Sequence, residues 1–257
     1  MTHWVRYELK GAVGFGALDG DSIAVHSGDM FANPKPTGAT VPLAAVKLLT
    51  PCVPGKMIAL WNNFHALAAK LKAAIPDEPL YLIKAASSYL AAGEPIRRPP
   101  GYSGKIVYEG ELGIVIGKRC SNASEAEAAK CIFGYTCIND VTAADTLNKN
   151  PAFAQWTRSK SHDTFGVFGP VIATGLDPAT LSVRTVLNGA EKQNYPVSDM
   201  ILPPVKLVSL LSRDMTLMPG DVIACGTSVG VGAMKEAKNM VEISIDGIGT
   251  LGNPFDQ

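Results

Sequence analysis

The feature that most constrains the fold of this chain is a pair of glutamates placed directly before an apolar segment. Glu109 and Glu111 stand two residues apart, and the largely apolar residues 112–116 follow them. Side chains alternate between the two faces of a β-strand, so both carboxylates are expected on the same face. Like charges this close repel each other unless positive charge lies between them. The pair therefore predicts a strand whose surroundings supply a cation.

A hard divalent metal ion is the usual cation in such a place, because Mg²⁺ and Ca²⁺ prefer carboxylate oxygens. Asp140 ends a second β-rich segment, residues 131–139. If the two strands are neighbours, three carboxylates converge on one ion and leave its remaining positions to water and substrate. The predicted metal ligands are therefore Glu109, Glu111 and Asp140. For the glutamate pair alone, the alternative is a solvated strand face.

Composition limits the class of protein. The 257 residues, 47% hydrophobic and 18% charged, allow one large domain or one domain with a small appendage. Basic and acidic residues balance at 23 each with no basic block, so nucleic acids and membranes are not expected partners. No apolar run reaches the roughly 18 residues of a membrane-spanning helix, and the N-terminus lacks a signal-peptide pattern. The five cysteines form no C-x-x-C pair, which indicates reduced thiols in the cytoplasm.

Short apolar segments separated by turn residues predict a small N-terminal β-rich lobe over residues 1–52. Its predicted strands are 5–9, 13–18 and 22–25, and its proline-rich residues 34–38 are predicted to form a loop.

The remaining residues, 53–257, are predicted to form a second domain in which strands dominate and helices are peripheral. A serine followed three residues later by a glutamate predicts the start of a helix at Ser124. The dipeptide Asn188-Gly189 predicts a hairpin turn. These patterns favour a β-rich α+β fold over an alternating βαβ array. The predicted strands are 56–60, 80–84, 171–173, 182–187, 222–224 and 240–245, and the predicted helices are 65–74, 124–129 and 205–212.

Several segments that follow one another along the chain carry a resemblance to a known family. Beside the three acidic residues, they are segments 115–118, 160–170, 218–232 and 247–254. Together they resemble the signature of the fumarylacetoacetate hydrolase family over residues 53–257, and residues 1–52 are similar to a small lobe that many members carry. The resemblance implies a rolled mixed β-sheet, a Mg²⁺ or Mn²⁺ ion that Ca²⁺ replaces in some crystals, and a homodimer.

The resemblance also implies roles for single residues. Lys160 is expected to point at the metal and the substrate, and Asp163 belongs to the same Lys-Ser-x-Asp segment. Asn63 belongs to the motif that opens the family's lid helix, so Asn63 and Asp163 are candidate substrate ligands. Thr227 lies in a glycine-rich turn and is a candidate to bind a substrate carboxylate. The alternative is that Thr227 only stabilises the turn. Apart from the resemblance, His162 lies two residues from Lys160, on the same face if this segment is extended, and is therefore a candidate for proton transfer.

The chain departs from the family pattern at the lid helix. Members carry a histidine and, three residues later, a glutamate, and this pair activates water or moves a proton. Aligned without a gap, Leu67 and Lys70 take these positions. With a two-residue deletion, His65 takes the histidine position and Ala68 that of the glutamate. Either alignment leaves a catalytic imidazole without its carboxylate partner.

A second departure lies after the metal-ligand aspartate. Many members have an arginine four residues beyond it that pairs with a substrate carboxylate, and this chain has Ala144 there. The difference argues against a dicarboxylate substrate such as oxaloacetate.

The predicted site indicates the first chemical step, formation of an enolate, but does not specify the product. A metal held by three carboxylates keeps open positions for a 2-keto acid or a 1,3-diketo acid, and stabilising the resulting enolate serves several reactions. The favoured function is C–C bond hydrolysis of an acylpyruvate-like compound in aromatic catabolism, with Lys160, His65 and His162 as catalytic candidates. An isomerase, tautomerase or decarboxylase of a related 2-keto acid is the alternative. A catalytically silent metal-binding scaffold is the third hypothesis.

Overall fold

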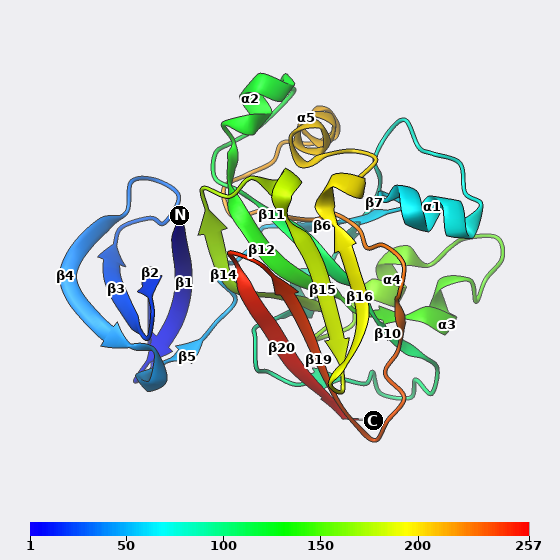
Figure 1. The fold of residues 1–257 in the computed structure, drawn as a ribbon, viewed down its shortest axis with the longest axis horizontal. Helices are drawn as coiled ribbons and strands as arrows, with labels where there is room; N and C mark the ends of the chain where they lie inside the picture. Colours follow the sequence, from blue (N-terminus) through cyan, green and yellow to red (C-terminus); the bar gives the residue numbers. More distant parts are fainter. Residues whose placement is uncertain (257) are drawn as a thin grey trace.

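The computed structural model describes residues 1–256, so the last residue of the predicted domain 53–257 lies outside the described residues. The chain is rich in strands, which form three sheets (Figure 1). This confirms the predicted β-rich α+β class with a mixed sheet. In the described part of the chain, no helix is long and apolar enough to cross a membrane.

The largest sheet has twelve strands, of which ten form a continuous path. Along that path, the strands are β4 (Lys35–Pro42), β3 (Ser22–Ser27), β2 (Ala12–Asp19), β1 (Thr2–Leu9), β14 (Gly166–Thr174), β12 (Ile132–Asp140), β11 (Gly110–Ile116), β17 (Val222–Ala224), β6 (Met57–Trp61) and β7 (Leu80–Lys84). The remaining two are β5 (Lys47–Leu48), which pairs with β1, and β8 (Tyr89–Leu90), which pairs with β14.

Two smaller sheets complete the fold. The strands of the five-stranded sheet are β16 (Ala190–Pro196), β15 (Ser182–Leu187), β19 (Lys238–Ile245), β20 (Gly249–Asp256) and β9 (Ile96–Arg97). The strands of the three-stranded sheet are β13 (Thr142–Ala143), β10 (Ile106–Tyr108) and β18 (Gly232–Ala233). The α-helices are α1 (His65–Leu71), α2 (Glu125–Ala129), α3 (Ala144–Leu147), α4 (Trp156–Lys160) and α5 (Pro204–Asp214). The 3₁₀ turns are η1 (Leu43–Ala45), η2 (Ala86–Ser88), η3 (Pro178–Thr180) and η4 (Val197–Asp199).

The N-terminal strands form one end of the molecule but belong to the large sheet, because β1 pairs with β14. The division of the chain after residue 52 stays a prediction. The predicted loop at residues 34–38 is wrong, because these residues lie in and beside β4, which pairs with β3. Pro36 is tolerated there because β4 is an edge strand, where a missing N–H costs no ladder hydrogen bond.

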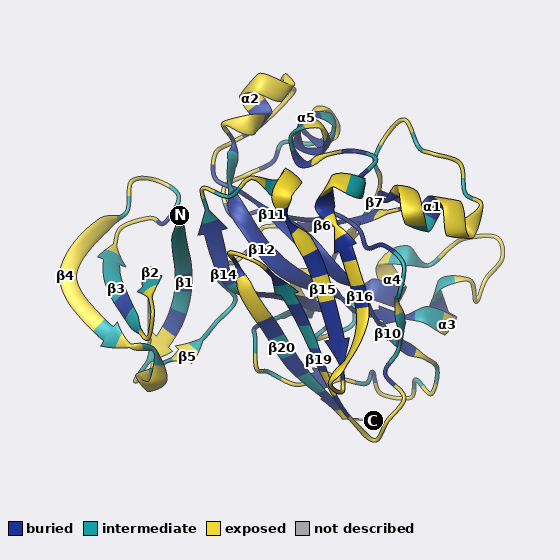
Figure 2. Cartoon of the chain, in the orientation of Figure 1, coloured by how far each residue is buried: buried dark blue, intermediate teal, exposed yellow. Residues whose placement is uncertain are grey.

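The centre of the large sheet is covered by the five-stranded sheet, and Figure 2 shows the covered strands β11, β12 and β14 as largely buried. Every residue of β11 is buried. Gly110 is required where the two sheets approach each other, because a Cβ there would lie 2.1 Å from the hydroxyl oxygen of Thr185. The residue between the two glutamates is thus fixed by sheet packing.

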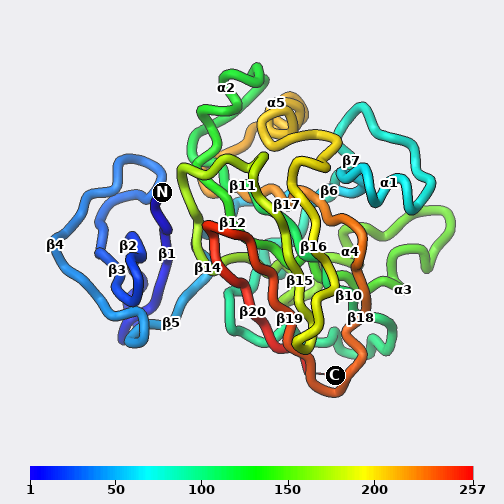
Figure 3. The backbone as a smooth tube through the Cα atoms, in the orientation of Figure 1, coloured from blue at the N-terminus to red at the C-terminus, as the bar shows by residue number. Residues whose placement is uncertain are grey.

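The helices lie outside the sheets, as predicted. Helices α1, α3 and α4 gather at the end of the molecule opposite the N-terminal strands (Figures 1 and 3). Helix α2 begins with the predicted capping box between Ser124 and Glu127. The hairpin turn at Asn188-Gly189 is also confirmed, since both residues have positive φ and β15 pairs with β16. Helix α1 ends earlier than predicted because Lys72 adopts a left-handed conformation.

Candidate functional site

The structure brings the three predicted carboxylates together. Ligand oxygens of Glu109, Glu111 and Asp140 all lie within 4.8 Å of one another. Strands β11 and β12 are antiparallel neighbours, so Glu111 near the start of one lies beside the end of the other. Glu109 lies in the break between β10 and β11, where the chain passes from the three-stranded to the twelve-stranded sheet.

Glu111 provides the test of whether a metal ion fits. Its side chain is fully buried, and one carboxylate oxygen accepts a hydrogen bond of 2.8 Å from the Gly226 N–H. The other oxygen, Oε1, is buried without a partner. Burial and the carboxylates of Asp140 and Glu109 raise the pKa of Glu111 well above its ordinary value. A buried carboxylate with an unpartnered oxygen is unfavourable unless a cation lies nearby. A divalent ion bound by oxygens of Glu111, Glu109 and Asp140 therefore fits the site.

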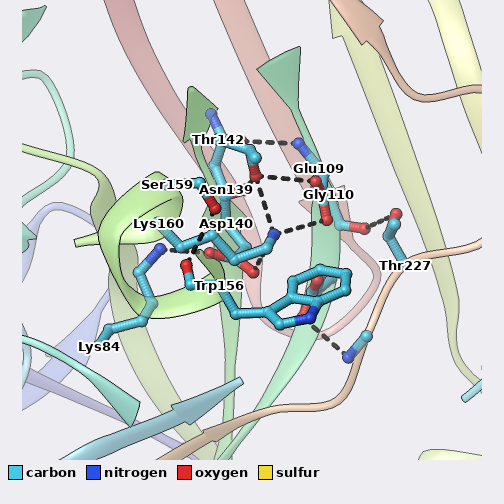
Figure 4. Close-up of polar contacts among 12 residues, drawn as sticks. Lys84, Glu109, Gly110, Asn139, Asp140, Thr142, Trp156, Ser159, Lys160 and Thr227 are labelled. Atoms are coloured by element: carbon cyan, nitrogen blue, oxygen red, sulfur yellow. Dashed lines mark hydrogen bonds and ion pairs between the residues drawn. The ribbon is translucent and has the colours of Figure 1, made fainter. Parts of the chain in front are cut away.

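Lys160, the last residue of α4, neutralises the other two carboxylates. Its ammonium donates to Asp140 Oδ2 at 2.6 Å and to Glu109 Oε2 at 3.0 Å, as Figure 4 shows. It also donates to the Thr142 hydroxyl at 2.8 Å. Burial lowers the pKa of Lys160, but the carboxylates of Asp140 and Glu109 outweigh it and raise the pKa. Its three contacts thus place Lys160 as a hydrogen-bond donor at the carboxylates.

Lys84, at the end of β7, is a second lysine of the site, and the sequence patterns did not identify it. Its side chain is fully buried and forms an ion pair with Asp140 (Figure 4). Burial lowers the pKa of Lys84, and the Asp140 carboxylate opposes this effect. The period of two in a strand places Lys84 on the buried face with Leu82, which was the available signal. Burial raises the pKa of Asp140, but Lys160 and Lys84 outweigh this effect and lower it. One oxygen of Asp140 pairs with Lys84 and the other with Lys160.

A buried glutamine that the sequence patterns also missed ties the glutamate pair to the glycine-rich turn. Gln193, on β16, accepts a hydrogen bond from the Gly110 N–H at 3.0 Å and donates one to the Thr227 hydroxyl at 2.8 Å. The Thr227 hydroxyl donates to the Gly110 carbonyl at 2.9 Å. Nothing in the local sequence of a hairpin strand signals this contact across sheets.

A cavity of about 240 Å³ opens beside the carboxylates. The polar residues of its lining are Lys160, Glu109, Thr142, Thr227 and Asn62. Lys160 donates hydrogen bonds to Glu109 and to Thr142. The rest of its lining is apolar and includes residues from helices α1, α3 and α4. These apolar residues are Leu60, Trp61, Leu67, Leu71, Val107, Ala144, Leu147, Trp156 and Val231.

Two sequence candidates near the lid helix lie away from this cavity. His65 is exposed at the start of α1 and is not among the lining residues, whereas Leu67 is. The structure therefore matches the alignment without a gap. Asn63 is buried, and its side-chain amide is used by backbone groups: it donates to the carbonyls of Leu202 and Cys225 and accepts from the Leu202 N–H. Asn63 thus joins the end of β6 to neighbouring loops.

His162 and Asp163 lie in a separate recess of about 480 Å³ that also includes Arg97 and Arg98. His162 packs edge-on against Phe165 at 5.3 Å, and burial lowers its pKa. Lys160 ends the helix α4, and Ser161 after it has φ −115° and ψ 17°, which is not an extended conformation. The extended backbone that would place His162 on the same face as Lys160 is therefore not formed.

Comparison with known proteins identifies the family. The family model described as "Fumarylacetoacetate (FAA) hydrolase C-terminal" matches residues 56–256, and a model described as "Rv2993c-like, N-terminal" matches residues 2–51. The chain belongs to the fumarylacetoacetate hydrolase family. This confirms the resemblance predicted from the sequence.

Relatives of this fumarylacetoacetate hydrolase family protein carry different names. It is 40% identical to Protein Rv2993c of Mycobacterium tuberculosis, over 97% of this chain and 96% of that protein. It is 35% identical to oxaloacetate tautomerase YisK of Bacillus subtilis, over 82% and 73% of the two chains. The crystal structure of 2-hydroxyhepta-2,4-diene-1,7-dioate isomerase from Mycobacterium marinum is 37% identical, with a TM-score of 0.90 over 100% and 98% of the chains. Family membership thus indicates an enzyme without specifying its reaction.

Proposed function

We propose that this protein is a Mg²⁺- or Mn²⁺-dependent enzyme that interconverts the keto and enol forms of a 2-keto acid. The observation that carries the proposal is the composition of the cavity beside the three carboxylates. Among residues 1–256, its lining contains a charged lysine and two threonines but no histidine. This set of groups suits stabilisation of an oxyanion more than activation of water.

The residues divide the work between holding a cation and stabilising charge on the substrate. Glu109, Glu111 and Asp140 would hold the metal ion, and Lys84 keeps Asp140 oriented. A divalent ion bound there acts as a Lewis acid that stabilises negative charge on a substrate oxygen. C3 of the 2-keto acid loses its proton to water, and Lys160 donates a hydrogen bond to the oxygen that becomes negative. Lys160 then transfers its proton to that oxygen to give the enol. The hydronium formed at C3 restores the proton of Lys160, so the reaction gains and loses no net proton.

C–C bond hydrolysis is the second candidate function, because the family model bears the name of a hydrolase. In that reaction water adds to the acyl carbonyl carbon of an acylpyruvate, and the bond to C3 breaks. The bonding electrons leave on C3, which takes up a proton, and the products are a carboxylic acid and pyruvate. Water has to be activated by a positioned base. Glu109 is the one carboxylate of the described residues that lines the cavity, and Lys160 and Thr142 already engage its oxygens.

One sample separates the two functions. With acetylpyruvate in D₂O and Mg²⁺, NMR measures deuterium incorporation at C3 beside the release of pyruvate, against a blank without enzyme. We expect metal-dependent exchange that is faster than pyruvate release. Pyruvate release as fast as exchange would establish the hydrolase instead. If a metal-loaded sample shows neither exchange nor pyruvate release, the result favours the third hypothesis, a catalytically silent metal-binding scaffold.

A pair of variants tests the site itself. Glu111→Ala removes the buried carboxylate with the unpartnered oxygen, so we expect loss of metal binding by titration calorimetry and loss of exchange. Glu191→Ala is the matched control, because Glu191 is exposed on β16 and pairs only with side chains of its own hairpin. Full metal binding by Glu111→Ala would contradict the proposed metal site. The homodimer, the cytoplasmic location and the role in aromatic catabolism stay predictions.

A further inference from the structure

The walls of the cavity away from Lys160 offer no partner for a second charge. Helix α1 contributes Leu67 and Leu71, and helix α3 contributes Ala144 and Leu147. Within residues 1–256, Lys160 is the one cationic residue in the lining, and its ammonium already contacts two carboxylates. A second substrate carboxylate in this cavity would be removed from water without a positive partner, which is unfavourable.

A second pocket of about 340 Å³ adjoins the cavity. Its lining consists of five residues, Trp61, Leu80, Tyr81, Leu82 and Trp156. Trp61 and Trp156 line both spaces, and their ring centroids lie 5.7 Å apart. We call this second space the outer pocket. The two tryptophans thus form a shared aromatic border between the outer pocket and the cavity.

The same helix joins the two ends of this arrangement. Helix α4 begins with Trp156 and ends with Lys160, four residues later, so both side chains lie on one face of a single turn. A ligand whose polar end contacts Lys160 therefore has Trp156 beside its more distant part.

The outer pocket offers no cationic partner. Its five lining residues include no lysine or arginine, and three of them are aromatic. Burial and the nearby carboxylate of Asp214 raise the pKa of the Tyr81 phenol. An apolar group finds aromatic contacts here, whereas a carboxylate finds no positive charge to pair with.

We propose that the outer pocket is a subsite for the apolar, preferably aromatic, tail of a 2-keto monocarboxylic acid whose polar end lies at Lys160 and Glu109. This inference rests on the proposed function and names its substrate class. It separates this chain from relatives whose names specify oxaloacetate or a heptadienedioate, both of which carry two carboxylates. Trp61, Trp156 and Tyr81 are then residues that determine specificity.

A matched pair of substrates tests the class. Benzoylpyruvate and 4-carboxybenzoylpyruvate differ only in a carboxylate at the far end of the ring, and acetylpyruvate lacks the ring. We expect kcat/KM for C3 exchange to be at least about tenfold higher for benzoylpyruvate than for either other compound, as apolar pockets discriminate on that scale. Equal or higher kcat/KM for 4-carboxybenzoylpyruvate would overturn the inference while leaving the proposed function intact. Absence of exchange with all three would instead reject the proposed function.

Variants of the border and the outer pocket test the location. Trp61→Ala is expected to lower kcat/KM for benzoylpyruvate about tenfold more than for acetylpyruvate. Tyr81→Ser, at a residue that is 38% exposed, gives the same test with less risk to folding. Phe153→Ala is the control, because Phe153 is a 70% exposed aromatic residue that lines neither space.

The competing occupant of the outer pocket is a second copy of the chain. Light scattering of the same variants distinguishes the two occupants. If Trp61→Ala and Tyr81→Ser change the oligomeric state and leave the ratio of the two kcat/KM values unchanged, the outer pocket is an interface and the inference is wrong. A changed ratio at an unchanged oligomeric state supports the subsite.

The converse change adds a cation to the cavity wall. Ala144 is half-buried at the start of α3 and has space in front of it in the cavity. We expect Ala144→Arg to raise kcat/KM for 4-carboxybenzoylpyruvate relative to benzoylpyruvate about tenfold. An unchanged ratio in a variant that still exchanges acetylpyruvate would show that charge in this cavity does not select the substrate.

Discussion

The charged centre and the apolar walls of the same cavity are built in different ways. The carboxylates and Lys84 come from strands or strand ends of the sheets, and their side chains are largely or wholly buried. The apolar walls come mainly from short helices and loops, and several of their residues, such as Leu71, are exposed. Strands thus fix the three carboxylates and Lys84, whereas Lys160 reaches them from the short helix α4. We propose that the peripheral elements determine which substrate reaches this centre. The first region carries the residues typical of the family, and we propose that the second region selects the substrate.

The largest effect is expected from removing the charge of the centre. Lys160→Met keeps an unbranched apolar side chain but removes the ammonium that contacts Asp140 and Glu109. We expect kcat/KM for C3 exchange to fall by about 10²–10³, the usual cost of losing one donor to a developing oxyanion. Lys130→Met, at an exposed position, is the control. A loss of less than a few fold would mean that Lys160 supports the fold alone.

The buried lysine of β7 should matter more for stability than for substrate choice. Lys84→Met leaves one oxygen of the buried Asp140 without its cation. Breaking a buried ion pair from one side costs about 3–5 kcal/mol, so urea denaturation should show a decrease of that order in the free energy of unfolding. Lys192→Met, at an exposed position of β16, serves as the control. Equal stability of both variants would show that Lys84 is replaceable in the fold.

The apolar wall offers a gain of activity. Leu67→His with Lys70→Glu places an imidazole on the cavity wall and a carboxylate three residues further along α1, on the same side of the helix. We expect pyruvate release from acetylpyruvate to rise about tenfold relative to C3 exchange, a modest part of what a positioned base contributes. Leu67→Asn with Lys70→Glu controls for polarity. A rise of the same size in the control would exclude the imidazole as its cause.

The smallest effect concerns motion of the lid, residues 62–75. This segment is anchored at its base where the Asn62 side chain donates to the Ala74 carbonyl at 2.9 Å. Its helix α1 has one fully buried residue, so we expect its amides to exchange with deuterium faster than those of β11. Benzoylpyruvate should slow this exchange. Protection equal to that of β11 without ligand would show that the lid does not open.

The spacing of residues predicted only part of the centre. Strand periodicity and the pairing of two neighbouring strands predicted that Glu109, Glu111 and Asp140 converge, whereas Lys160 was expected there from the family resemblance. Lys84 and Gln193 escaped detection because their contacts join segments 56 and 83 residues apart along the chain. No local pattern contains such a contact.

The outer parts of the site were harder to predict for a different reason. His65 and Leu67 lie on one short helix, and only the direction in which that helix presents its side chains decides which of them lines the cavity. His162 was placed beside Lys160 on the assumption of an extended chain, but Lys160 ends a helix and Ser161 has φ −115° and ψ 17°, so the chain is not extended there. The strand β4 was missed because Pro36 is a poor strand residue except at an edge, and edges are set by tertiary pairing.

The aromatic border also gives the protein an optical signal of its own. Of the three tryptophans in the chain, Trp61 and Trp156 form the border, and Trp4 lies in β1, which four strands separate from β6 along the sheet path. A ligand that enters between the paired indoles changes their emission without any attached dye, while Trp4 supplies an internal reference. Enol forms of aromatic 2-keto acids absorb in the range where indoles emit, so occupancy of the border is readable as quenching during turnover.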